Sequence, residues 1–204
     1  AWMDPDALAS NPAFAAVSED WARKLAAYPE AKARHDDAVA AAKAAGTRAP
    51  DAPWGPGHTA TPSGLYNGMI HPVVPYALRG VIWYQGENNA HQADRYAPLF
   101  SALITGWRAR FGQGDLPFFW VQLPNYRFTG NDNLEWAFLR EAQTRALALP
   151  ATGQAVTIGL GDVADPHPAN KREVARRLAR LALARTYGLA IADRGPAFAA
   201  AVRE

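Results

Sequence analysis

An aspartate and a histidine, each followed by a proline, stand two positions apart in the run Asp165-Pro166-His167-Pro168. A residue before proline is pushed into extended backbone geometry, and alternate residues of an extended segment point to the same side. The carboxylate of Asp165 can therefore hold an imidazole N–H of His167, which fixes the tautomer of a general base. The spacing alone fits equally a loop histidine beside an acidic residue, and Asp162 is a competing carboxylate.

A second polar cluster, Gln85-Gly86-Glu87-Asn88-Asn89, follows the apolar residues 81–84. Gly86 permits a sharp turn that exposes a backbone N–H, and the amides of Gln85 and Asn88 can donate hydrogen bonds to a developing oxyanion. Glu87 can anchor the turn by accepting hydrogen bonds from these amides. An ordinary polar loop, with Asn89 as the N-cap residue of a helix, explains the same residues.

Three further polar side chains are candidates for lining a substrate site. Tyr66 and Asn67 lie between two glycines shortly before residues 81–84, where a tight turn would pack near the site. Asn125 follows the second apolar run, residues 117–123. No histidine pair has the spacing of metal ligands, so no metal site is predicted.

The elements that would position these residues alternate between strands and helices. Short apolar runs predict strands at 81–84, 117–123 and 155–160, and helical periodicity predicts helices at 91–111, 134–149 and 170–187. Strands that are apolar throughout, separated by helices, indicate a parallel sheet covered on both faces, a three-layer α/β/α sandwich. Such sheets carry their chemistry at the carboxyl ends of the strands, where the polar clusters fall.

The N-terminal part has a different texture. In residues 5–46, Phe14, Trp21 and Leu25 recur at helical spacing, and Pro29 suits the first turn of a second helix that stops at Gly46. We therefore expect a helical hairpin, followed by a Pro/Gly-rich connector over residues 47–64. The chain starts at Ala1 rather than at a methionine, which suggests a piece of a longer protein.

The composition limits the classes of protein. The chain has 204 residues, of which 49% are hydrophobic, enough for one sizeable core. No apolar run reaches the roughly 18 residues of a membrane-spanning helix, and a net charge of +2 does not by itself imply nucleic acid or an anionic membrane. The basic residues of 171–185 are predicted to form a solvated helix face, so neither nucleic acid nor membrane is expected as a partner. The absence of cysteine excludes disulfides, thiolate metal sites and a cysteine nucleophile.

Four segments together resemble the sialate O-acetylesterase-like branch of the SGNH hydrolases. They are PSGLYNGMIHPVVPYALRGVIWYQGENNA (62–90), FFWVQLPNY (118–126), REAQTRALALPATGQAVTIGLGD (140–162) and DPHPANKREVARRLA (165–179). The resemblance implies a flavodoxin-like fold and a Ser-His-Asp esterase that removes O-acetyl groups from sugars without a cofactor. His167 matches the family's catalytic base and Asp165 the residue that orients it. The segment Gln85-Gly86-Glu87 matches the loop on the oxyanion side, and Asn88 replaces the usual serine.

The resemblance also implies that the nucleophile lies outside this chain. In the family it is a serine after the first strand of the sheet, upstream of the part that resembles Ala1. None of the four serines, Ser10, Ser18, Ser63 and Ser101, is predicted to lie in a strand-to-helix turn. Residues 1–190 therefore resemble a partial catalytic domain without its N-terminal strands, and 191–204 a tail leading out of it, so the remainder of the polypeptide is an expected partner.

The resemblance leaves several acetylated sugars open, among them sialic acid, xylan and pectic sugars, and relatives acting on glycans are often extracellular or periplasmic. A non-catalytic carbohydrate-binding module descended from such an esterase is the alternative, because several aromatic side chains could stack on sugar rings.

Overall fold

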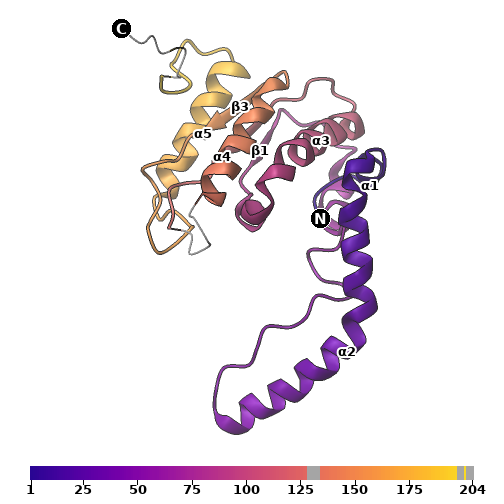
Figure 1. The fold of residues 1–204 in the computed structure, drawn as a ribbon. Coiled ribbons are helices and arrows are strands. Elements are labelled where there is room, and N and C mark those ends of the chain that lie inside the picture. The colour runs from indigo at the N-terminus through magenta and orange to yellow at the C-terminus, as the bar shows by residue number, and fades with distance from the viewer. Residues whose placement is uncertain (128–133, 197–199, 201–204) are drawn as a thin grey trace. The chain divides into compact units, whose positions relative to one another are not determined.

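A parallel sheet of three strands organises the C-terminal part of the chain. The computed structural model describes residues 1–127, 134–196 and 200 (Figure 1). They divide into two compact units, the first made of Ala1–Tyr76 and Thr105–Phe111, the second of Ala77–Ile104 and Gly112–Glu204.

The sheet lies in the second unit and has the order β1-β2-β3. Its strands are β1 (Val81–Trp83), β2 (Phe118–Val121) and β3 (Thr152–Ala155). β2 is central and pairs in parallel with both neighbours, with Trp120 opposite Trp83 on one side and Gln154 on the other. All four residues of β2 are buried, as expected of a strand covered on both faces.

Helices cover both faces of this sheet. On one face, Phe100 of α3 (Ala93–Phe111) packs against Trp120, with ring centroids 5.1 Å apart, and side chains of α4 (Glu135–Arg145) bond to Gln122 and Gln154. On the other face, α5 (Lys171–Arg185) contributes half of an apolar cluster with the sheet. The cluster contains Phe119, Val121, Ala155, Val174, Leu178 and Leu181. The prediction of an α/β protein with a parallel sheet and helices on both faces is confirmed.

The third strand lies earlier than the sequence predicts. It covers Thr152–Ala155, whereas the apolar run predicts residues 155–160. Thr152–Ala155 are the residues that pair with β2. Gly153 has no side chain, so the side chains of Phe119 and Leu181 can pack closely against this strand. Val156 and Ile158 are 45% and 53% exposed, so their apolar character does not mark a buried strand.

The predicted helices of the second unit are confirmed to within a few residues. α3 is preceded by a 3-10 segment, η4 (Glu87–Gln92), which occupies the start of the helix predicted from residue 91. α4 is extended by a further 3-10 turn, η5 (Ala146–Ala148). α5 begins after Asn170, whose side-chain oxygen accepts a hydrogen bond from the N–H of Glu173 and so caps the helix.

The first unit is helical, but it contains no hairpin at residues 5–46. Besides the last residues of α3, its helices are α1 (Pro5–Ala9), η1 (Pro12–Phe14), α2 (Ala15–Ala45), η2 (Tyr66–Ile70) and η3 (His71–Val73). The predicted break at Pro29 is wrong, because α2 continues through this proline as one helix of 31 residues. Pro29 removes one backbone hydrogen bond of the helix, and the helix bends part-way along its length (Figure 1). No glycine or asparagine lies nearby to form a left-handed turn, so the chain does not reverse its direction into a hairpin. The helix ends at Gly46, as predicted, in the left-handed conformation.

Two contacts order the rest of the first unit. Asp4 caps α1 by accepting hydrogen bonds from the N–H groups of Asp6 and Ala7, and it pairs with Arg110. In the connector, the ring of His58 stacks on Trp54 with centroids 4.8 Å apart, and Lys24 of α2 lies over the Trp54 ring. None of the helices described over 1–127 and 134–196 is long and apolar enough to cross a membrane.

Candidate active site

Asp165 and His167 form a hydrogen-bonded pair, as the Asp-Pro-His-Pro spacing predicts. Nδ1 of His167 lies 2.8 Å from Oδ1 of Asp165, and the backbone N–H of His167 donates to the same oxygen at 2.8 Å. Because an ionised carboxylate only accepts hydrogen bonds, Nδ1 carries the hydrogen and Nε2 remains available to take a proton. The side chains of His167 and Asp165 are 72% and 60% exposed, so both groups are accessible from solvent.

The pair lowers the pKa of Asp165. The backbone N–H of His167 is the largest cause and the imidazole is the second, since both donate to the ionised carboxylate. The stabilisation from the Asp165–His167 hydrogen bonds is therefore fully present at a pH above the ordinary pKa of aspartate, near 3.8. It is lost as the pH falls through the lower pKa that Asp165 has in the folded chain.

We expect the carboxyl carbon of Asp165 to titrate by NMR with a midpoint below its ordinary value. In a His167→Ala variant the midpoint should rise only part of the way, because the backbone N–H still donates. A midpoint at or above the ordinary aspartate value in the unmodified chain would show that the pair is not formed.

The loop before this pair is held by the loop that follows β2. Oδ1 of Asn125 accepts hydrogen bonds from the N–H groups of Gly159 and Gly161, at 2.8 and 3.0 Å. A Cβ on Gly161 would lie 1.9 Å from the carbonyl oxygen of Asn125, so only glycine fits there. Thr157, which is fully buried, donates to the carbonyl of Gln122 at 2.5 Å. Asn125 therefore positions the segment that leads to Asp165, and its predicted contact with a substrate stays a prediction.

The Gln85–Asn89 loop is a tight turn built around Gly86. Gly86 has φ of 153°, and a Cβ there would lie 3.1 Å from Nε2 of Gln143 and 3.2 Å from Leu139, so the turn depends on glycine. The side-chain amide of Gln85 donates to Oδ1 of Asn89 at 2.9 Å. Asn88 is exposed. Gly86 is buried against α4, and the oxyanion role of the loop remains a prediction.

Glu87 does not anchor the loop in the way that the sequence suggested. Within the described residues no hydrogen bond joins Glu87 to the amides of Gln85 or Asn88, and Asn89 is the acceptor instead. Glu87 acts on Tyr84, whose pKa rises to about 12, mainly through burial and secondarily through the negative charge of Glu87.

Both polar clusters lie at the same edge of the sheet. All three strands are parallel, so the Gln85–Asn89 loop after β1 and residues 156–170 after β3 leave from the carboxyl edge. Lys171 connects them, because its ammonium lies 5.3 Å from the centroid of the Tyr84 ring. The start of α5, four residues after His167, therefore lies against the residue that follows β1.

Tyr66 and Asn67 belong to the first unit. Tyr66 is 2% exposed, so its ring is part of the core of that unit, and burial is the main cause that raises the pKa of its hydroxyl. Asn67 is exposed. That these two residues line a substrate site remains a prediction.

Gln143 is a site residue that the sequence did not indicate. It is fully buried in α4, where its Oε1 accepts a hydrogen bond from the N–H of Leu123 at 2.9 Å. Its Nε2 donates to the carbonyls of Gln85 and Val121, at 3.3 and 3.4 Å. One side chain thus ties the loop after β1 to the end of β2. A glutamine on the apolar face of a helix, between Leu139 and Ala146, is the signal that could have revealed it.

All four serines lie in the described part of the chain, and none follows a strand directly. Ser10 ends α1, Ser18 lies in α2 and Ser101 lies in α3. Ser63 has a left-handed backbone, with φ of 56°, but it is 5% exposed in the connector. This arrangement gives none of these hydroxyls the open strand-to-helix turn of a serine nucleophile.

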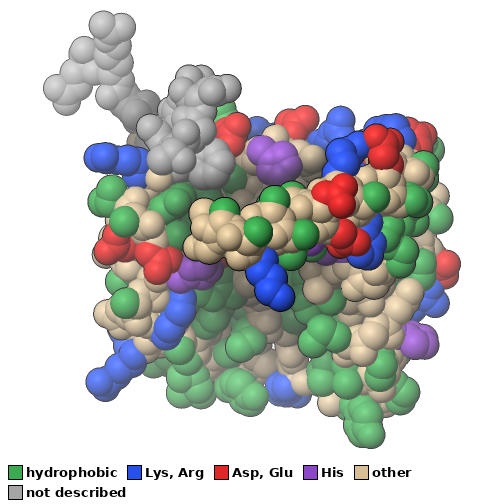
Figure 2. All heavy atoms as spheres, turned by 90° about the horizontal axis from the view of Figure 1, so that it is seen from below, with side chains coloured by type: hydrophobic (Ala, Val, Ile, Leu, Met, Phe, Trp, Pro, Cys, Tyr) green, Lys and Arg blue, Asp and Glu red, His purple; other side chains and the backbone are tan. Residues whose placement is uncertain are grey.

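Four arginines of α5 bond within the molecule: Arg176, Arg177, Arg180 and Arg185. Glu173 pairs with Arg176 and Arg177, which lowers the pKa of that carboxyl to about 2, and Arg185 pairs with Asp193. On the face shown in Figure 2, basic and acidic side chains are intermixed rather than gathered into one cationic field. Across the described residues, no three His, Asp or Glu side chains come together in a way that could hold a metal ion.

A parallel sheet with a histidine–carboxylate pair in the segment after its third strand is an arrangement suited to hydrolytic enzymes. Residues 19–184 match the family model "carbohydrate esterase, sialic acid-specific acetylesterase", and the chain belongs to this family. The chain is 40% identical over 147 residues to a sialate O-acetylesterase of Rattus norvegicus and 39% identical over 142 residues to that of Mus musculus. These alignments cover 63% and 61% of the chain but only 27% and 26% of the relatives.

A solved structure agrees with the family. The crystal structure of a carbohydrate acetylesterase from Xanthomonas citri matches with a TM-score of 0.62 and 50% sequence identity, covering 65% of this chain and 32% of that chain. The chain thus spans about a quarter to a third of the length of these relatives.

Proposed function

We propose that the chain is part of an enzyme that hydrolyses O-acetyl esters on carbohydrates. The observation that carries the proposal is the hydrogen-bonded pair of Asp165 and His167, exposed at the carboxyl edge of the sheet in a chain of the sialic acid-specific acetylesterase family. The relatives of known structure or curated description carry acetylesterase names.

The pair supplies the base of a Ser-His-Asp mechanism. A serine hydroxyl attacks the acetyl carbonyl while Nε2 of His167 takes its proton, and Asp165 stabilises the imidazolium. The N–H of Gly86 and the amide of Gln85 face the developing oxyanion. The imidazolium then protonates the departing sugar oxygen, and a water molecule repeats the sequence on the acetyl-serine to release acetate.

The serine and the rest of the sheet are assigned to polypeptide outside this sequence. Support comes from β1, which pairs with β2 alone in the described residues, and from Ile82, which is 69% exposed. Further strands beside β1 would complete a flavodoxin-like SGNH domain of which residues 1–190 form the later part. The O-acetylated glycan is the expected substrate, with acetylated sialic acid first among the candidates because of the family.

The test compares two polypeptides, the 204-residue chain and the natural protein that contains it, in the hydrolysis of p-nitrophenyl acetate and of an O-acetylated sialic acid. The longer protein should release acetate from both substrates. The chain alone should remain at or near the buffer rate, because loss of a nucleophile typically costs several powers of ten in rate.

Two outcomes would contradict the proposal. An inactive longer protein, folded by circular dichroism, would argue against the esterase. Hydrolysis by the chain alone that is abolished by His167→Ala would place the nucleophile within these residues.

A further inference from the structure

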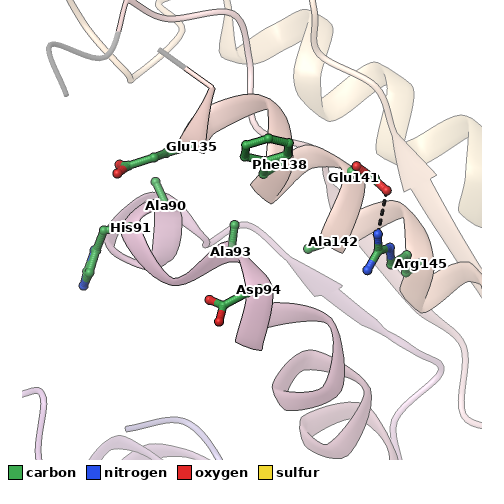
Figure 3. Close-up of a pocket in the computed structure, with 9 residues that line it drawn as sticks. All are labelled: Ala90, His91, Ala93, Asp94, Glu135, Phe138, Glu141, Ala142 and Arg145. Atoms are coloured by element: carbon green, nitrogen blue, oxygen red, sulfur yellow. Dashed lines mark hydrogen bonds and ion pairs between the residues drawn. The ribbon is translucent and has the colours of Figure 1, made fainter. Parts of the chain in front are cut away.

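A groove beside the Gln85–Asn89 loop is not used by the proposed mechanism. It has a volume of about 390 Å³ and lies between α4 and the segment that joins η4 to α3 (Figure 3). We call it the α4 groove. It is lined by Ala90, His91, Ala93, Asp94, Glu135, Phe138, Glu141, Ala142 and Arg145.

Helix α4 borders both the α4 groove and the Gly86 turn. Gly86 packs against Leu139 and Gln143 of α4, and each of these residues is next in sequence to a groove residue, Phe138 or Ala142. On the opposite wall, Ala90 and His91 belong to η4, which continues directly from the same loop. A molecule in the groove would therefore contact α4 and η4, the two elements that border the Gly86 turn.

The lining has the composition of a sugar-binding surface. Phe138 is 54% exposed, an unusual position for a large aromatic ring on a helix that packs on a sheet, and an exposed ring is a stacking surface for the C–H face of a sugar. Carboxylates around it can accept hydrogen bonds from hydroxyl groups. Oε2 of Glu135, which reaches from α4 toward η4 (Figure 3), is buried without a hydrogen-bond partner in the part of the chain that the structure describes.

The charge of the lining selects among sugars. The lining contains three carboxylates, Asp94, Glu135 and Glu141, and one guanidinium, that of Arg145, which already pairs with Glu141 at 2.7 Å. With His91 neutral, the groove therefore carries a net negative charge. A sugar carboxylate placed there would be repelled by Asp94 and Glu135, and no unpaired guanidinium in the lining compensates it.

We propose that the α4 groove binds a sugar unit that carries no acid group, within the glycan whose O-acetyl group reaches His167. This inference rests on the proposed function for the identity of the glycan. The sugar unit in the groove would carry no acid group. This holds whichever sugar of the glycan bears the acetyl ester. An acidic residue such as sialic acid would then occupy the catalytic side of the turn rather than the groove.

The test measures binding to the unmodified 204-residue chain by ¹H–¹⁵N NMR, which needs no ester hydrolysis. The probes are three neutral disaccharides (lactose, xylobiose and cellobiose), together with cellobiouronic acid and the β-1,4 dimer of glucosamine as charged counterparts of cellobiose. At least one neutral disaccharide should give saturable shifts confined to the amides of Ala93, Asp94 and Ala142. The acid should bind at least about tenfold more weakly than its neutral counterpart, the size expected for one unfavourable charge contact.

Variants assign the shifts to the groove. Phe138→Ala should weaken binding about tenfold or more, and Leu134→Ala, which removes an equally exposed side chain just before α4, should leave it unchanged. The double variant Asp94→Asn/Glu135→Gln should remove the discrimination against the acid.

Absence of saturable shifts with every neutral disaccharide, or shifts that survive Phe138→Ala, would overturn the inference. Stronger binding of the acid than of cellobiose, or weaker binding of the glucosamine dimer than of cellobiose, would overturn the assignment of the unit by charge. Groove binding in a protein whose longer form hydrolyses no acetyl ester would refute the proposed function and leave this site standing.

Discussion

Replacement of His167 by alanine in the longer, active protein should lower kcat for acetate release by about 10⁴-fold or more, with little change in KM. Without the imidazole, no group lies beside Asp165 to take the proton of the attacking hydroxyl, and the serine remains a weak nucleophile. The side chain is 72% exposed and packs in no core, so the variant should keep its fold. Circular dichroism and the thermal midpoint would verify this.

Asp165→Asn should lower kcat by about 10² to 10⁴-fold, because the neutral amide no longer stabilises the imidazolium and can turn its N–H₂ toward Nδ1, which selects the wrong tautomer. Asp162→Asn is the matched control. Asp162 lies in the same loop but bonds to the backbone N–H of Ala164 at 2.7 Å rather than to the histidine. Its variant should retain most of the activity.

Each outcome assigns a role. A His167→Ala enzyme that keeps a tenth of the activity would remove His167 from the chemistry. An Asp162→Asn enzyme as impaired as Asp165→Asn would transfer the orienting role to the competing carboxylate.

The pairing of Asp165 with His167 was predictable because it depends on local geometry. Two prolines restrict the backbone before each of them, so spacing alone brings the side chains together. The same locality explains the helices, since their apolar periodicity survives in the structure as the buried stripe of Val174, Leu178 and Leu181.

Features that depend on partners distant in sequence were not predictable. The segment Thr152–Ala155 contains a threonine, a glycine and a glutamine, and it is a strand because β2 pairs with it. The more apolar residues that follow look like a better strand but leave the ladder after Ala155. At Pro29 the prediction failed for a different reason. Proline is a local signal for the start of a helix, but the residues on both sides of it favour a helix, and α2 continues through it.

The polar groups that shape the site show the same division. Gly86 was expected to turn the chain, and it does. Asn125 holds the Gly159–Gly161 segment through a contact between residues 34 positions apart, which the sequence does not reveal. Asn89 rather than Glu87 accepts the hydrogen bond from Gln85 because of the detailed shape of the turn.

Gln143→Leu should lower the free energy of unfolding by about 2–3 kcal/mol, because a buried donor or acceptor left without a partner costs about 1–3 kcal/mol. Leucine is no smaller than glutamine, so the loss is not a cavity effect. The N–H of Leu123, a residue with no exposed surface, loses its acceptor, and the carbonyls of Gln85 and Val121 lose a donor.

Gln113→Leu is the matched control for this variant. Gln113 also makes two bonds to backbone, both with Leu78 at 2.9 Å, but on the exposed surface, where water can replace them. Urea unfolding should place this control within about 0.5–1 kcal/mol of the unmodified chain, with the same dependence on denaturant. Equal losses for the two variants would mean that burial of Gln143 adds nothing. A neutral Gln143→Leu variant would show that the loop after β1 and the end of β2 are held together by packing against α4 rather than by its amide.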